Sequence, residues 1–310
     1  MSNWFLIALI APILWSIVNH IDKYMLSKYL KDRGVGALLI FSALASVVIL
    51  PFIAYFYHNE IFSISINDFW MLILIGLLSA GAFFFYLKGM DAEEATIVIP
   101  LFQLVPVFGY FLGYFILKET LSTQQIFSSL LIISGIVILA LEIDTDNKVT
   151  LKTKVLAMVS ISSFLFALHD TLFKKVAIVE SFWVSVFWQY ASLTIFGILA
   201  LIFIRKFRND FLSMFKNIGG KVLSLNIVSE LLYIFGNLTN NFATLMAPVA
   251  VVLVVSSYQP LFVFIGGVFL TIFLPHISME KISAKHLIHK IISIIIIIIG
   301  SYFLYASSNY

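Results

Sequence analysis

Long apolar stretches follow one another along almost the whole chain, and short polar links separate them. A membrane-spanning helix needs about 20 apolar residues, whereas a strand of a membrane barrel alternates polar and apolar residues. Runs such as Ile291–Ile299 and Val249–Val255 show no alternation, so the sequence predicts helices. Ten spans are expected, near residues 4–22, 36–57, 68–89, 94–117, 122–142, 153–173, 182–204, 222–243, 247–274 and 286–306.

The composition supports a membrane protein and excludes several other classes. Apolar residues make up 61% of the chain and charged residues 11%, against about 45–50% and 25% in soluble domains. So few charges cannot cover a soluble enzyme or form a nucleic-acid-binding surface. The chain has no cysteine, no glycine-rich phosphate loop and no Ser/His/Asp arrangement. We therefore expect the lipid bilayer as a partner, no nucleic acid, no enzyme activity, no catalytic residues, no metal and no cofactor.

An internal repeat divides the chain into two halves. An aromatic residue stands eight positions before a lysine in the first helix of each half, two prolines mark the fourth helix, and a late glycine marks the fifth. These markers are Trp15 with Lys23 and Phe166 with Lys174; Pro100 with Pro106 and Pro248 with Pro260; and Gly135 and Gly300. Because five helices is an odd number, two such halves in one membrane must be inverted, which is typical of secondary transporters. We predict an all-α membrane domain with repeats at 1–147 and 148–310.

Short motifs resemble the drug/metabolite transporter superfamily, in particular its EamA-type ten-helix branch. Its Leu-Trp-Gly…Asn…Lys opening is similar to Leu14-Trp15-Ser16 with Asn19 and Lys23. Its Glu-Pro-Val…Leu-Gly-Glu pattern resembles Val105-Pro106-Val107-Phe108 followed by Leu117-Lys118-Glu119, and Gln124 and Gly135 fit its fifth helix. The second half departs from the pattern: Gln259 precedes Pro260, Phe273 stands where an acid is expected, and Glu280 comes seven residues late.

The resemblance implies a secondary carrier of small metabolites with a central cavity between the halves and no cofactor. We expect helices 1, 3, 4, 6, 8 and 9 to line that cavity. The expected location is the bacterial inner membrane, and the expected assembly is a monomer or homodimer with a small-molecule substrate.

Polar residues form one continuous face of the predicted eighth helix. Asn226, Glu230, Tyr233 and Asn237 follow one another at spacings of four, three and four, and Asn240 or Asn241 continues the face. Because a charge at membrane depth is costly, Glu230 is a candidate cation or proton site and its neighbours are candidate substrate contacts. The alternative is that these groups only bond neighbouring helices.

The predicted sixth helix carries a second candidate site. His169 and Asp170 are candidates for proton exchange. Asp170 and Lys174 are also spaced to form an ion pair along the helix, which would neutralise both. The sequence leaves these two interpretations open.

Other candidate substrate contacts lie on the remaining helices expected around the cavity and on the seventh. Trp15 and Asn19 share a face of the first helix, and for Trp15 packing between the repeats is the alternative. The others flank a proline or form an isolated polar cluster: Gln103, Tyr110, Gln189 and Ser257.

The deepest predicted charges, Glu230 and Asp170, indicate a small polar substrate that is amino-acid-like, cationic or zwitterionic. A multidrug or lipid-linked-sugar carrier is the first alternative, because aromatic residues make up 16% of the chain. A receptor or scaffold that does not transport is the second. The link 205–221, with five basic residues among apolar ones, is either an amphipathic surface segment or a basic loop.

Overall fold

A computed structural model describes residues 4–28, 34–92, 98–99, 101–102, 104–140, 153–217, 220–273 and 284–307 of the protein. Every element in this part is helical, as the apolar runs predict. The elements of the first half are α1 (Trp4–Lys28), α2 (Gly34–Ala45), η1 (Ser46–Ile49), α3 (Leu50–Ile61), α4 (Ile66–Ala92), α6 (Leu104–Leu112), η2 (Gly113–Leu117) and α7 (Thr123–Ala140). Those of the second half are α8 (Thr153–Ala177), α9 (Phe182–Phe203), α10 (Arg205–Asn217), α11 (Gly220–Met246), α12 (Val249–Ser256), α13 (Gln259–Phe273) and α14 (Ala284–Ser307).

Six helical segments in the described part are long and apolar enough to cross a membrane. They are Trp4–Leu26, Gly34–Ile61, Ile66–Ala92, Thr153–Ala177, Phe182–Phe203 and Val249–Phe273. Leu104–Leu117 and Ile292–Ser307 are shorter apolar helices. Many large apolar side chains point outward, such as Phe56, Trp70 and Tyr302, which suits a surface that faces lipid.

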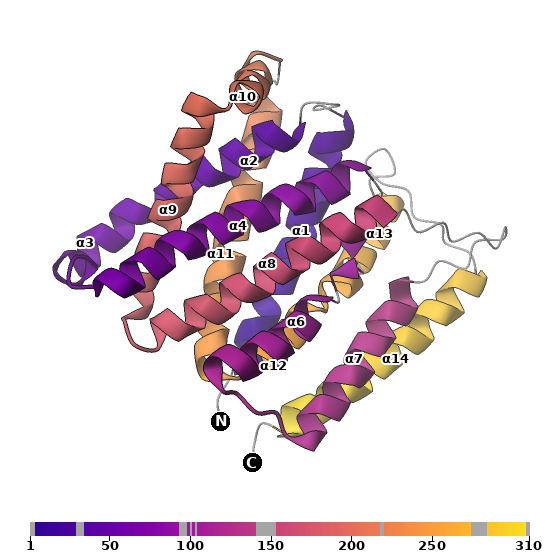
Figure 1. The fold of residues 1–310 in the computed structure, drawn as a ribbon. Coiled ribbons are helices and arrows are strands. Elements are labelled where there is room, and N and C mark those ends of the chain that lie inside the picture. Colours follow the sequence, from indigo (N-terminus) through magenta and orange to yellow (C-terminus); the bar gives the residue numbers. More distant parts are fainter. Residues whose placement is uncertain are drawn as a thin grey trace.

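The helices pack in pairs that join distant parts of the sequence (Figure 1). α1 lies along α11, α4 along α8, α2 along α9 and α7 along α14. Two glycines allow the last pair to approach closely: a Cβ at Gly135 would lie 2.9 Å from a carbon of Ile297, and one at Gly300 would lie 2.8 Å from a carbon of Ile132. Small residues at such crossings are typical of helix packing in membranes.

The start of α1 and the end of α14 lie at the same end of the bundle (Figure 1). The rings of Phe5 in α1 and Tyr305 in α14 are 5.8 Å apart. Both helices also contribute to one buried apolar cluster, which includes Trp4 and Leu304.

Two helical segments are interrupted, and one of the breaks lies next to a proline. α12 ends at Ser256 and α13 begins at Gln259, one residue before Pro260. In the first half, a π-helical turn (η2) ends at Lys118, whose φ of 59° is in the left-handed region. This conformation reverses the chain, and the Glu119 amide then bonds the Gly113 carbonyl at 3.2 Å.

The basic link after α9 is a helix. α10 packs against α2, and a Cβ at Gly36 would lie 2.7 Å from the Phe207 ring. Met214 and Asp210 are buried on the same side, whereas Arg205 and Lys206 are exposed. The link is therefore an amphipathic helix and not a basic loop, with Phe207 and Met214 on its apolar side; its contact with a membrane surface stays a prediction.

Candidate functional site

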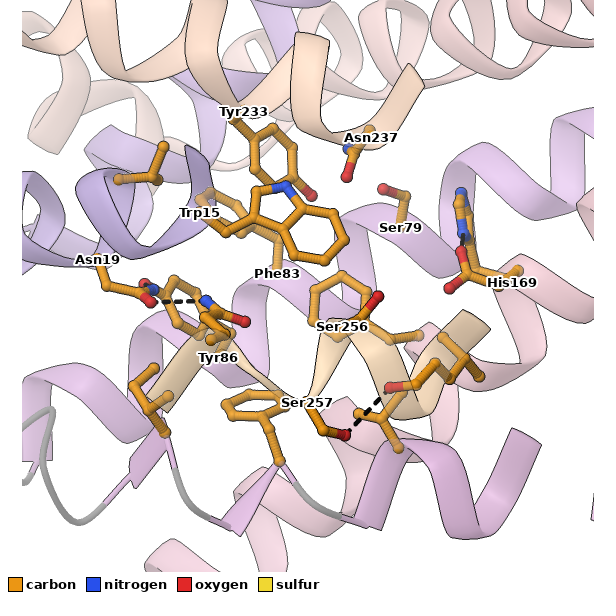
Figure 2. A pocket seen from close by; sticks show the side chains of 18 of the residues that line it. Trp15, Asn19, Ser79, Phe83, Tyr86, His169, Tyr233, Asn237, Ser256 and Ser257 are labelled. Atoms are coloured by element: carbon orange, nitrogen blue, oxygen red, sulfur yellow. Dashed lines mark hydrogen bonds and ion pairs between the residues drawn. The ribbon is translucent and has the colours of Figure 1, made fainter. Parts of the chain in front are cut away.

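A cavity of about 110 Å³ lies where α1, α4, α8, α11, α12 and α13 meet (Figure 2). All six helices that the sequence predicts around the cavity contribute to its lining. Ile99, Phe102 and Val105 are the contribution of the predicted fourth helix. The lining residues are Trp15, Val18, Asn19, Asp22, Ser79, Phe83, Tyr86, Ile99, Phe102, Val105, Phe166, His169, Asp170, Tyr233, Asn237, Leu253, Ser256, Ser257, Gln259 and Pro260.

One wall of the cavity is a chain of hydrogen bonds centred on Asn19 (Figure 2). The Gln259 amide donates to Asn19 Oδ1 at 2.6 Å, and Asn19 Nδ2 donates to the Tyr86 hydroxyl at 2.7 Å. The Tyr86 hydroxyl in turn donates to Asp22 Oδ2 at 3.1 Å, and the Ser229 hydroxyl also bonds Asp22. This chain joins four helices, two from each half, and it holds a buried carboxylate at the cavity edge.

Aromatic rings form a continuous belt along the cavity. Neighbouring ring centroids are 5.6 Å apart for Tyr233 and Phe83, 5.5 Å for Phe83 and Tyr86, 5.9 Å for Tyr86 and Phe102, and 6.2 Å for Phe102 and Phe166. All five residues line the cavity. Faces of aromatic rings attract cations as well as apolar groups.

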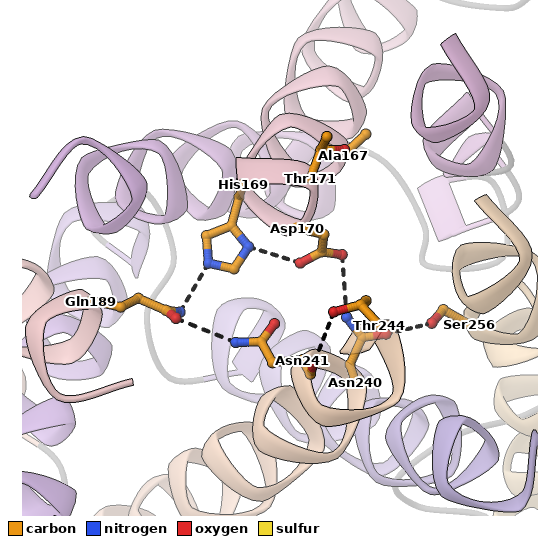
Figure 3. A network of polar contacts seen from close by, with 9 residues as sticks. All are labelled: Ala167, His169, Asp170, Thr171, Gln189, Asn240, Asn241, Thr244 and Ser256. Atoms are coloured by element: carbon orange, nitrogen blue, oxygen red, sulfur yellow. Dashed lines mark hydrogen bonds and ion pairs between the residues drawn. The ribbon is translucent and has the colours of Figure 1, made fainter. Parts of the chain in front are cut away.

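The second polar centre is a network around His169 and Asp170 (Figure 3). His169 Nδ1 lies 2.8 Å from Asp170 Oδ1, and the Asn240 amide donates to Asp170 Oδ2 at 3.2 Å. The Gln189 amide nitrogen lies 2.9 Å from His169 Nε2. An amide nitrogen only donates, so in this arrangement His169 Nε2 accepts from Gln189, and the Nδ1–H donates to Asp170 Oδ1.

Two further bonds anchor the network to α11 and α12. The Asn241 amide donates to Gln189 Oε1 at 3.3 Å, and the Ser256 hydroxyl donates to Asn240 Oδ1 at 2.9 Å. Three of the network residues, His169, Asp170 and Ser256, also line the cavity.

Glu230 lies behind the cavity wall. It is buried on α11, and the Ser42 hydroxyl of α2 donates to its Oε1. Asn226 is one turn away on α11 and is only 1% exposed. Neither polar atom of the Asn226 side chain has a partner among the described residues. Glu230 thus points toward α2, while Tyr233 and Asn237 reach the cavity.

Lys174 forms a different ion pair from the one its spacing suggests. Its Nζ lies 2.5 Å from Glu119 Oε1 and donates to the Ala247 carbonyl at 2.8 Å. The Val249 amide, at the start of α12, donates to Glu119 Oε2 at 2.8 Å. The interpretation in which Lys174 neutralises Asp170 is wrong, because Glu119 reaches Lys174 from the first half and Asp170 turns to His169 and Asn240.

The sequence model of the EamA-like transporter family matches residues 2–141. The first half of the chain is EamA-like. This confirms the resemblance to the drug/metabolite transporter superfamily, whose opening and fourth-helix motifs both lie in the EamA-like half. Together with six helices of spanning length in the described part, the match indicates an integral membrane protein whose residues 2–141 are similar to a transporter family.

A solved structure, titled only as the crystal structure of a protein, shares the fold. It aligns over 100% of this chain and 98% of its own, with a TM-score of 0.63 and 13% sequence identity. At this identity the likeness concerns the fold alone, and it extends beyond the EamA-like half over the second half. No curated protein matches the chain.

The cavity gathers seven of the predicted site residues. These are Trp15, Asn19, His169, Asp170, Tyr233, Asn237 and Ser257. Glu230, Asn226 and Gln189 are buried outside the lining, and Gln189 contacts the cavity only through His169. The structure does not bring Tyr110 to the cavity: its side chain is 39% exposed on α6, because the helix turns that face outward. Gln103 lies outside the described residues.

Sequence reasoning missed Asp22, Tyr86 and Phe83. Asp22 follows Asn19 by three residues, so it continues the polar face of α1 that Trp15 and Asn19 begin. That spacing could have identified it. The aromatic residues of α4 stand in an apolar run, where sequence alone cannot separate cavity lining from lipid contact. The predicted late acid of the second half, Glu280, also lies outside the described residues.

Proposed function

We propose that the protein is a secondary transporter built from two inverted five-helix repeats, 1–147 and 148–310, in a bacterial inner membrane. Two corresponding lysines support the repeat. Lys23, near the end of the first helix of its half, donates to the carbonyl of Met90 near the end of α4 at 3.1 Å. Lys174 donates to the carbonyl of Ala247, directly after α11, at 2.8 Å. The crossed pairs α1–α11 and α4–α8 support it as well, since each joins the first predicted span of one half to the third predicted span of the other.

The substrate in this proposal is a small polar metabolite that is amino-acid-like, cationic or zwitterionic. The single observation that carries it is the cavity between the halves, which combines polar and charged groups of both with aromatic rings. Alternating access of this cavity to the two sides moves the substrate. A multidrug carrier of the same fold is the second candidate, favoured by the aromatic belt.

Proton coupling in this proposal uses carboxylates that a substrate ammonium group can also occupy. Asp170, with His169 beside it, lines the cavity, and Glu230 lies behind the wall. A carboxylate binds either a proton or a cationic group at one time. Because of this mutual exclusion, release of the substrate on one side of the membrane is coupled to uptake of a proton from the same side.

The test is uptake into proteoliposomes of purified protein. A panel of amines, amino acids and bulky drugs separates the two candidates by size and charge. Asn237→Leu removes a cavity amide and should abolish uptake of the transported compound. Thr239→Val is the matched control on α11, because its hydroxyl bonds only the Phe235 and Gly236 carbonyls of its own helix. Equal uptake by both variants would contradict the cavity as the transport site.

A further inference from the structure

The charged groups that line the cavity are unbalanced. Asp22 and Asp170 both belong to the lining, and no lysine or arginine occurs among the described residues that line it. Lys174, one turn beyond Asp170, is held by Glu119 at 2.5 Å. His169 is held between the Gln189 amide, 2.9 Å from its Nε2, and Asp170, 2.8 Å from its Nδ1. The cavity therefore presents two carboxylates and favours a cationic occupant.

The two carboxylates lie at opposite ends of the cavity. Both are tied to α11: Ser229 bonds Asp22, and Asn240 bonds Asp170 at 3.2 Å. These two positions are eleven residues apart on one helix, which at 1.5 Å per residue is about 16.5 Å along the axis. A charge-assisted hydrogen bond of about 2.8 Å at each end leaves about 11 Å between two bound nitrogen atoms.

The surface between the carboxylates is aromatic. The belt passes beside Asp22 at Tyr86, whose hydroxyl donates to that carboxylate at 3.1 Å. It ends at Phe166, which is one helical turn before Asp170 on α8. Methylene groups pack well on such rings, and the carbon next to an ammonium group carries part of its positive charge.

We propose that the cavity binds an elongated organic dication of the α,ω-diamine class, with one ammonium group at Asp22, the other at Asp170 and the alkyl spacer along the aromatic belt. This inference rests on the proposed function and narrows its substrate class. A short amine reaches only one carboxylate, so the length of the spacer determines affinity.

The test is thermal stabilisation of the purified full chain in detergent, which measures binding without requiring transport. The probes are 1,8-diaminooctane, 1,4-diaminobutane, and 8-amino-1-octanol, which has the length of the first but a single charge. We expect 1,8-diaminooctane to bind about tenfold or more tightly than either other probe, because only it bonds both carboxylates. Equal binding of 8-amino-1-octanol, or no binding of 1,8-diaminooctane, would overturn the inference.

Two variants test the assigned ends. Asp22→Asn and Asp170→Asn should each lower the affinity for 1,8-diaminooctane to the affinity for 8-amino-1-octanol. Asp210→Asn removes a buried carboxylate on α10, outside the cavity, and should keep the preference. An unchanged preference in Asp22→Asn would overturn the assignment, and the wild-type probe series decides the inference if a variant does not fold. Uptake of 1,8-diaminooctane into proteoliposomes is measured in parallel: binding without uptake would refute transport and leave the binding site standing.

Discussion

Removal of the Lys174 side chain should destabilise the protein through the carboxylate it leaves behind. Lys174 and Glu119 are 2.5 Å apart, and their side chains are only 13% and 15% exposed. Removing one partner of a buried pair costs about 3–5 kcal/mol, whereas exposed pairs contribute about 0–1 kcal/mol. This pair lies near the buried limit, but Glu119 keeps its bond from the Val249 amide at the start of α12. We therefore expect Lys174→Ala to lose about 2–3 kcal/mol of unfolding free energy.

The measurement is the melting temperature of the purified protein. For a large domain, 1 kcal/mol corresponds to about 2–4 °C, so Lys174→Ala should melt about 5–10 °C lower. Lys175→Ala is the control, because this neighbouring lysine is exposed. Ligand binding in the cavity should persist in Lys174→Ala, since Lys174 does not line it.

A double variant isolates the pair from other effects of the mutation. Glu119→Gln combined with Lys174→Met removes both charges and leaves an acceptor for the Val249 amide. It should recover at least half of the stability that Lys174→Ala loses. A double variant no more stable than Lys174→Ala, or a Lys174→Ala protein that melts with the wild type, would refute the reasoning.

Three further predictions concern the proposed transporter. Glu230→Gln should remain folded, because Gln still accepts from Ser42, while transport or its dependence on pH is lost; normal pH-dependent transport across a pH series would make this carboxylate structural. Reporters fused to the two termini should lie on the same side of the membrane, and opposite signals would remove the ten-helix architecture. Gly135→Leu should lower the melting temperature by several degrees, because a Cβ there already lies 2.9 Å from Ile297; Gly220→Leu, with nothing within 4 Å, is the control, and equal melting of both would contradict the close α7–α14 packing.

The helices could be predicted because each one has its own signal in the sequence. Apolar runs of spanning length gave α1, α4, α8 and α9 to within a few residues, and Pro260 marked the break between α12 and α13. The ten-helix inverted repeat stays a prediction. Helix existence depends on local composition, so no knowledge of packing was needed for this step.

The site was only partly predictable because it depends on which face of each helix meets the cavity. Periodicity grouped Glu230 with Tyr233 and Asn237, but α11 lines the cavity only along the latter two and turns Glu230 toward Ser42. Local spacing likewise paired Lys174 with Asp170. In the structure Lys174 pairs instead with Glu119 of the first half. Glu119 follows a left-handed residue, Lys118, and the spacing of residues along α8 carries no information about that turn.

The polar contacts between the halves indicate that neither half can satisfy its buried groups alone. Asn19 of the first half accepts from Gln259 of the second, and Ser42 of the first half donates to Glu230 of the second. At the other end of the cavity, Glu119 binds Lys174. Each buried polar group that loses its partner costs about 1–3 kcal/mol, and in lipid no water replaces the lost bond. The cavity and the bundle around it therefore depend on bonds that only the two halves together supply.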